Sequence, residues 1–207
     1  MQISEGELLG LVREVDDTHR EAMTTFAKGA AMVSLAGAAV ALSASAAQAD
    51  DTDIAAFAAS IELAAVAAYA KAAAALSGVV LTVAKTFASH HQDHANAWNS
   101  AAGAKAVKVP NARLLAALSP TLDAARTQTD VLTFALGLEN RAASTYQFAL
   151  ENLTTAPAFE LTASVMPIEG QHAVVIGTVL GKPAQELIPT NFQSRDGFID
   201  PAQFPVS

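Results

Sequence analysis

Two stretches of this sequence, residues 57–76 and residues 134–153, repeat one pattern at a constant separation of 77 positions. Alanine matches carry little weight in so alanine-rich a chain, but a shared Phe, Glu and Tyr at fixed spacing is hard to obtain by chance. The matching pairs are Phe57 and Phe134, Ile61 and Leu138, Glu62 and Glu139, Ala65 and Ala142, Tyr69 and Tyr146, and Leu76 and Leu153. The residues that follow continue the relation at a separation of 78, with His91 over Glu169 and His94 over His172. The repeat predicts two similar hairpins of helices.

The composition favours helices over sheet and excludes several classes of function. Of the 207 residues, 52% are apolar but only 6% aromatic, and alanine, the strongest helix former, dominates the apolar share. A chain of this length is expected to form one domain with appendages. Its net charge of −8 comes without a basic cluster, so nucleic acid and anionic membrane surfaces are not expected partners. Without cysteine, any metal must be held by nitrogen and oxygen.

Hydrophobic periodicity and turn residues predict five longer helices. They cover residues 4–27, a stretch capped by Asp51 or Asp53 that runs to Ser77-Gly78, residues 80–102, about 121–153, and 158–180. The connection 104–120 is expected to carry one short turn around Leu114–Leu118, and Pro167 to kink or open the last helix. The expected organisation is an N-terminal segment 1–49, a bundle 50–182, and an extended tail 183–207 that lies over the bundle through Phe192, Phe198 and Phe204.

The stretch from Gly29 to Ala49 has 21 residues without a charge and the shape of a secretory leader. The acidic residues before it differ from the positive start of a leader, and its alanine, serine and glycine make a poor membrane span. A retained helix packed on protein is favoured, with a leader for export and a membrane span as alternatives. Because such a helix needs cover, residues 1–49 are expected to contribute to a homo-oligomer or filament-like assembly.

Ligand-type side chains fall on one stripe of each bundle helix, because positions three, four or seven apart share a helical face. The candidate metal ligands are Glu62, His91, His94, Glu139, Glu169 and His172. Buried carboxylates are costly without a partner, and Lys71, Lys85 and Arg141 do not share these faces. A metal ion would remove that cost. Tyr69 and Tyr146 are expected to donate hydrogen bonds to the ligand carboxylates.

Several neighbouring residues have plainer interpretations. His94 and His172 could be core histidines hydrogen-bonded to carboxylates in a site that has lost its metal. His90 is expected to face away from the stripe, at the surface or behind the ligands. Asp93 is expected to be solvated, and His19, among the acids of the first helix, to lie at the surface.

This pattern resembles the ferritin-like superfamily of di-iron and di-manganese carboxylate proteins, in which two helices each give a Glu and two others each give Glu-x-x-His. Glu139 and Glu169-Gly-Gln-His172 match, whereas the first half has His91-Gln-Asp-His94 in place of Glu-x-x-His. Residues 87–94 and 26–29 resemble most the bacterial ferritin-like, desiccation-associated group. Members of that group often carry a twin-arginine leader, and Met23-Thr24 stands where the arginine pair would be. The implied fold is all-α: a ferritin-like four-helix bundle with an extra N-terminal helix and an extended C-terminal tail.

The resemblance implies two bound iron ions, with manganese or a single ion as alternatives. Two divalent ions carry four positive charges against three carboxylates, and imidazole bridges metals poorly. Glu62, Glu139 and Glu169 are therefore the expected bridges, with His91 at one end. Three functions stay open: an oxidoreductase with ferroxidase- or peroxide-type chemistry, a stress-protective metal-binding protein without turnover, and a structural assembly protein on a ferritin-like scaffold. No catalytic residue is assigned.

Overall fold

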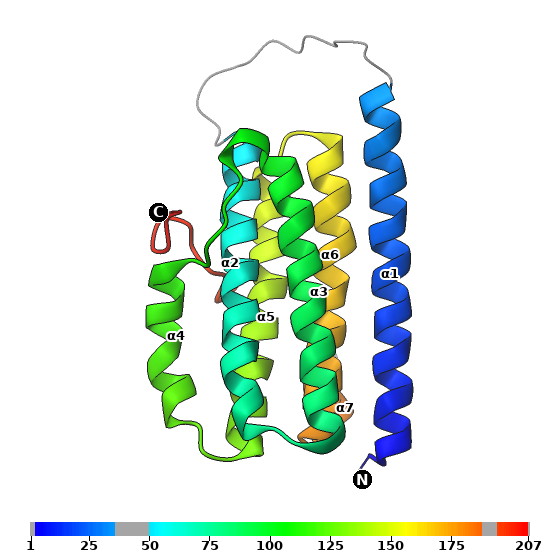
Figure 1. The fold of residues 1–207 in the computed structure, drawn as a ribbon, viewed down its shortest axis with the longest axis vertical. Coiled ribbons are helices and arrows are strands. Elements are labelled where there is room, and N and C mark those ends of the chain that lie inside the picture. Colours follow the sequence, from blue (N-terminus) through cyan, green and yellow to red (C-terminus); the bar gives the residue numbers. More distant parts are fainter. Residues whose placement is uncertain (1–2, 36–49, 188–193, 207) are drawn as a thin grey trace.

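The computed structural model describes residues 3–35, 50–187 and 194–206, and of residues 25–35 it describes the backbone alone. The regular structure of these residues is entirely helical, and four helices run side by side as a bundle (Figure 1). The bundle helices are α2 (Asp51–Ala72), α3 (Gly78–Ala102), α5 (Gln128–Asn152) and α6 (Ala156–Val179). The others are α1 (Glu5–Leu35), α4 (Ala112–Ala124), α7 (Ala184–Leu187) and two 3₁₀ turns, Ala73–Ala75 and Gly103–Lys105. The predicted all-α bundle is confirmed.

The bundle consists of two helical hairpins, α2–α3 and α5–α6. Alanines such as Ala59 and Ala64 are fully buried in α2, and their small side chains let the neighbouring helices approach closely. One exposed carboxylate joins the hairpins: Asp51, at the start of α2, accepts hydrogen bonds from the backbone N–H of Thr154 and Thr155, before α6 (2.9 and 2.8 Å). The hairpins therefore lie in register, which places their repeated residues at the same height.

The helix boundaries follow from caps. The Asp50 side chain accepts from the backbone N–H of Thr52 at the start of α2, and Thr127 with Asp130 forms a reciprocal capping box at the start of α5. Gly78 and Gly103, at the two ends of α3, have φ of 56° and 57°, a region that favours glycine.

The connection before the third bundle helix differs from the expectation, and it involves a proline. The connection 104–120 carries a 13-residue helix, α4, which continues through Pro120, and the next helix starts at residue 128 instead of about 121. Pro167 also lies inside a helix, α6, as expected, and the predicted kink or opening there stays a prediction. A proline in a helix frees the carbonyl four residues earlier. Ala116 and Ala163 hold these positions and both are exposed, so water can satisfy the freed groups.

The tail after α7 packs on the outer side of α2 and α5. Ile199 is buried, and its backbone N–H donates to Thr145 Oγ1 (2.9 Å). Phe198 stacks on Phe148 with ring centroids 4.5 Å apart, and Phe204 packs against the cluster around Ile199. Phe192 lies outside the described residues.

Asn111 joins α4 to this tail. Its Oδ1 accepts from the backbone N–H of Leu114 (3.0 Å) as an N-cap, and its Nδ2 donates to the carbonyl of Phe204 (2.9 Å). We expect Asn111→Ala to lower the free energy of unfolding by about 1–3 kcal/mol, because it removes the cap and leaves a part-buried carbonyl without a donor. Urea unfolding measures this. The control Asn96→Ala, at an exposed position, should change stability by less than about 0.5 kcal/mol. Equal effects at both positions would contradict the tethering role.

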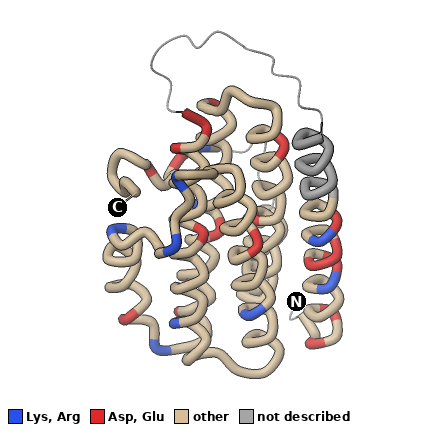
Figure 2. The backbone as a smooth tube through the Cα atoms, turned by 45° about the horizontal axis from the view of Figure 1, so that its top comes forward, with Lys and Arg blue, Asp and Glu red and all other residues tan. Residues whose placement is uncertain are grey.

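The N-terminal helix α1 lies along α3 and α6 (Figure 1). Leu8, Val12, Val15 and His19 form its buried stripe. Its exposed side carries several Asp, Glu and Arg residues, beside bundle helices that carry few charges (Figure 2). The predicted leader, membrane and assembly roles of residues 29–49 fall mainly outside the described residues and stay predictions.

Among the described residues, one helical stretch, Asp51–Ala75, is long and apolar enough to cross a membrane. Its most apolar part is 67% buried inside the bundle, as in a core helix.

Candidate metal centre

Six ionisable side chains from all four bundle helices meet in the middle of the core. Glu62 comes from α2, His91 and His94 from α3, Glu139 from α5, and Glu169 and His172 from α6. None is more than 3% exposed. They form two overlapping groups in which one ligand atom per residue lies within 4.8 Å of all the others: Glu62, His91, His94 and Glu169, and His91, Glu139, Glu169 and His172. The structure thus brings together all six residues that the sequence predicts as ligands.

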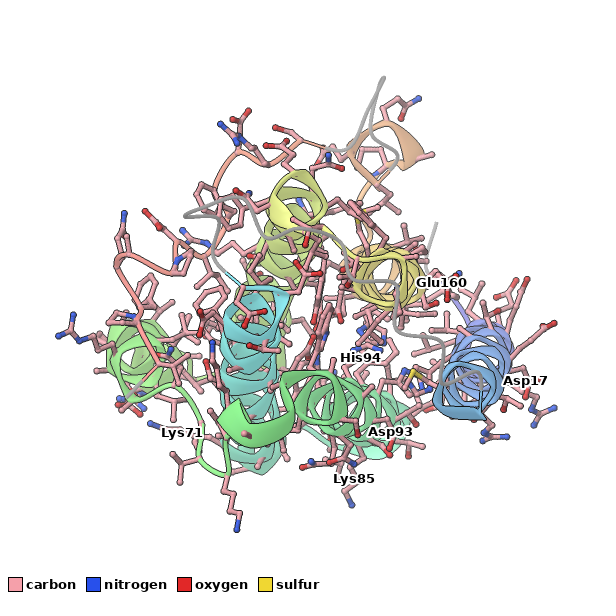
Figure 3. All side chains as sticks on the ribbon, turned by 90° about the horizontal axis from the view of Figure 1, so that it is seen from above. Asp17, Lys71, Lys85, Asp93, His94 and Glu160 are labelled. Carbon is pink, nitrogen blue, oxygen red and sulfur yellow. The ribbon has the colours of Figure 1, made fainter. Side chains whose placement is uncertain are left out.

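Imidazole nitrogens and carboxylate oxygens are close neighbours throughout the centre. His91 reaches both hairpins, with Nδ1 2.7 Å from Glu62 Oε2 and Nε2 3.3 Å from Glu139 Oε1. His172 Nδ1 lies 3.2 Å from Glu139 Oε2, and His94 Nδ1 lies 3.0 Å from Glu169 Oε1. No Lys or Arg among the described residues joins them: Figure 3 shows Lys71 and Lys85 pointing out of the bundle and His94 pointing into it.

Several of these buried atoms have no hydrogen bond. Neither carboxylate oxygen of Glu169 and neither ring nitrogen of His94 makes a hydrogen bond. His94 Nδ1 lies 3.0 Å from Glu169 Oε1, close enough for an ion pair when the imidazole is protonated, but without hydrogen-bond geometry. Leaving a buried carboxylate unsatisfied is costly. A cation between these atoms would satisfy all of them, and three carboxylates with three imidazoles suit iron, manganese or zinc.

The electrostatics of the centre without metal place protons on the imidazoles. Burial alone would lower the pKa of His91, but Glu169, Glu139 and Glu62 outweigh it and raise that pKa well above its usual range. Burial also opposes the rise at His94, where the carboxylates of Glu62 and Glu169 still raise the pKa to about 9. For Glu62, burial raises the pKa, but His91 and His94 outweigh it and lower it to about 2. Metal ions entering the centre therefore replace protons.

These shifts predict a pH dependence for the protein treated with a chelator. The raised pKa of His94 stabilises the fold fully below its usual 6.5, and this contribution is lost as pH rises through about 9. The lowered pKa of Glu62 stabilises the fold above its usual 4.5, and this contribution is lost as pH falls towards 2. We expect the melting temperature of the metal-free protein to be highest between these limits and to fall steadily from about pH 6.5 to about pH 9. A melting temperature that stays constant over that range would contradict the ion network.

Two tyrosines each donate a hydrogen bond to a ligand carboxylate of the other hairpin. Tyr69 of α2 donates to Glu139 Oε1 of α5, and Tyr146 of α5 donates to Glu62 Oε1 of α2. Burial and the nearby carboxylates raise the pKa of both phenols well above the usual value, so they remain donors. The repeat is thus a structural one, in which each hairpin orients the Glu of the other.

The symmetry is broken at two positions. Trp98 Nε1 donates to the Tyr146 hydroxyl (2.9 Å), whereas the repeat places Ile176 beside Tyr69. His91 stands where the second half has Glu169, and these two residues alone belong to both ligand groups. The helix pair α3 and α6 thus brings positions 91 and 169 to the middle of the cluster. The expectation that Glu62, Glu139 and Glu169 bridge two ions, with His91 at one end, stays a prediction.

Two histidines lie buried beside the centre. His19 and His90 are each 2% exposed, so the expected surface position of His19 is wrong, whereas His90 takes the second of its two expected positions, behind the ligands. His90 lies directly behind His172, with its Nδ1 2.9 Å from His172 Nε2, and its Nε2 is 3.1 Å from Asp16 Oδ1 of α1. The spacing of His19 from Leu8, Val12 and Val15 was the available signal, since it places all four on one helical stripe. Asp93 is exposed, as expected.

Residues 50–182 match the model of a family described as a ferritin-like domain. This range contains α2 to α6 and all six clustered residues, whereas α1 lies outside it. No curated protein and no solved structure matches the chain. The resemblance to the desiccation-associated group stays a prediction.

Proposed function

Because the chain belongs to the ferritin-like domain family, we propose that its buried centre binds two transition-metal ions. The ions are iron, in preference to manganese. The centre is then the site of an oxidoreductase with ferroxidase- or peroxide-type chemistry. One observation carries the proposal: the carboxylate of Glu169 and the imidazole of His94 are fully buried and only 3.0 Å apart, yet neither group makes a hydrogen bond. A purely structural network of histidines and carboxylates would leave fewer such atoms unpaired.

The two overlapping groups give each ion its own residues. Glu62 and His94 would hold one ion and Glu139 and His172 the other, with Glu169 and His91 between them. When bound, the ions would supply oxidation–reduction chemistry shared between two adjacent centres. The protein residues have separate tasks: Tyr69 and Tyr146 fix the carboxylate orientations, and the apolar core around them excludes water.

A small cavity next to Tyr146 supports access for a small apolar reactant. Its volume is about 130 Å³, and its lining is largely apolar, including Ile54, Phe57, Ala58 and Ala149. The Tyr146 hydroxyl is hydrogen-bonded to Glu62, so the cavity lies one residue away from the centre. Dioxygen is small and apolar enough for such a space.

A second function, metal holding without turnover, is favoured by His91. The fourth carboxylate that balances two divalent ions is absent, so the second ion is expected to bind more weakly. A protein with one tightly held ion would bind metal and stabilise the bundle without shared two-ion chemistry.

Anaerobic loading with Fe(II), followed by exposure to air, separates the two functions. For the oxidoreductase we expect the near-ultraviolet absorption of ferric iron to appear at least about tenfold faster than in protein-free buffer, because bound ligands that favour Fe(III) speed oxidation. Binding of Fe(II) without faster oxidation would overturn the oxidoreductase and leave the holding function. Failure to bind Fe(II) at all would overturn both.

A further inference from the structure

The N-terminal helix brings a separate group of ligand-type side chains against the outside of the centre. Asp16 and His19 of α1 and His90 of α3 each offer one ligand atom, and these three atoms lie within 4.8 Å of one another. We propose that these residues form an outer site for a divalent transition-metal ion, between solvent and the six-residue centre. The site goes beyond the proposed function, since two of its residues lie outside the family match.

His19 supplies the observation that points to a ligand. Its side chain is 2% exposed, yet its Nε2 has no hydrogen-bond partner. Burying an unsatisfied ring nitrogen is costly, so a partner for it is expected.

Asp16 connects the group to solvent. Its side chain is 24% exposed; Oδ1 lies 3.1 Å from His90 Nε2, and Oδ2 pairs with the exposed Arg20. One carboxylate and two imidazoles make a nitrogen–oxygen ligand set that suits Fe(II), Co(II) or Zn(II). The open side leaves room for water to complete the coordination. Asp17, on the same helix, points away from the bundle (Figure 3) and provides a matched control.

The two imidazoles are stacked, with ring centroids 4.0 Å apart and planes at 22°. Lone pairs lie in the ring plane, so nearly parallel rings cannot direct them at one ion, and one ring has to turn. His90 is held on both sides, by Asp16 and His172. His19 has no hydrogen bond at Nε2 to lose and is the ring that turns.

His90 also links the outer site to the centre, and this step rests on the proposed function. His90 Nε2 faces Asp16 Oδ1 (3.1 Å), and His90 Nδ1 faces His172 Nε2 (2.9 Å). His172 in turn presents Nδ1 to the centre, 3.2 Å from Glu139 Oε2. A continuous row of ligand-type side chains thus leads from the part-exposed Asp16 to the centre, so ions that bind at the outer site pass along it to the centre.

To test the outer site alone, the full chain carries Glu169→Gln, a substitution that disables metal binding in the centre. Chelator-treated protein is titrated with Co(II) alone, without oxygen, by visible absorption and calorimetry. We expect the Glu169→Gln chain to bind one Co(II). Adding Asp16→Asn or His19→Phe should weaken the affinity for this ion at least about tenfold. Adding Asp17→Asn should change the affinity by less than about twofold. His19→Phe keeps the stacked ring and removes only its nitrogens. No binding, or failure of either substitution to weaken it in variants that keep the circular dichroism of the parent, would overturn the site.

The transfer of ions is tested without Glu169→Gln. Asp16→Asn in the otherwise unchanged chain should slow filling of the centre by Co(II) roughly tenfold, because the exposed carboxylate attracts the ion, and should leave the final occupancy unchanged. Asp17→Asn should have no effect on the rate. Equal rates for both variants would overturn the transfer step. If the unchanged chain binds Co(II) no more tightly than Glu169→Gln, the proposed function fails, while the Glu169→Gln titration still decides the outer site.

Discussion

Glu169→Gln is expected to weaken binding of the first metal ion in the six-residue centre at least about 100-fold and to prevent binding of the second ion there. Glu169 is the only carboxylate that belongs to both ligand groups, and neither of its oxygens makes a hydrogen bond. Glutamine keeps the size of the side chain but removes the negative charge and replaces one ligand oxygen with an amide nitrogen. Anaerobic titration with Fe(II) or Mn(II) against a competing chelator measures both affinities.

Two further variants make the result specific to the centre. Glu62→Gln touches one ligand group only, so one ion should still bind with close to its original affinity. Glu160→Gln changes an exposed residue of the same helix, labelled at the edge of the bundle in Figure 3, and should leave both affinities unchanged. Equal affinities for Glu169→Gln and Glu160→Gln would contradict the assignment.

His91→Glu is expected to have opposite effects on the metal-free and the metal-loaded protein. The substitution gives the first half the Glu-x-x-His pattern of the second. Without metal, it removes a protonated imidazole between three carboxylates and adds a fourth acid, which should lower stability by about 3–5 kcal/mol. With two divalent ions, four carboxylates balance four positive charges, so the second ion should bind at least about tenfold more tightly.

Urea unfolding with and without saturating Mn(II), in the absence of oxygen, tests this reversal. His91→Gln is the matched control: it removes the imidazole without adding a charge, so metal should not restore its stability to the same degree. A metal-free His91→Glu protein as stable as the unchanged chain would mean that the carboxylates do not meet at position 91. Destabilisation that metal does not reverse would argue against ions in the centre.

The sequence repeat carried enough information to predict the bundle and the six clustered residues. Glu62 and Glu139, with their tyrosines at the same spacing, fix which face of α2 and α5 points inward, and the histidines do the same for α3 and α6. Helical periodicity is a local property, so these facing residues could be identified without knowing how the helices pack. The packing then brings all six within reach of one another.

Other features depend on contacts that periodicity does not show. His19 was expected at the surface because its neighbours in sequence are acidic, but α1 buries it against His90 and His94. The helix α4 is longer than the short turn expected around Leu114–Leu118, because Pro120 is tolerated inside it where the freed carbonyl belongs to the exposed Ala116. The central position of His91 follows from how α3 faces α6, which no single helix reveals.

The most direct test of the account is to locate the metal. Crystals of the full chain, loaded with Fe(II) without oxygen, would be measured on both sides of the iron absorption edge. The account predicts anomalous density between Glu169, Glu62 and His94, between Glu169, Glu139 and His172, or at both positions, with ligand distances of about 2 Å. Iron-loaded crystals with no anomalous density among these residues would contradict it.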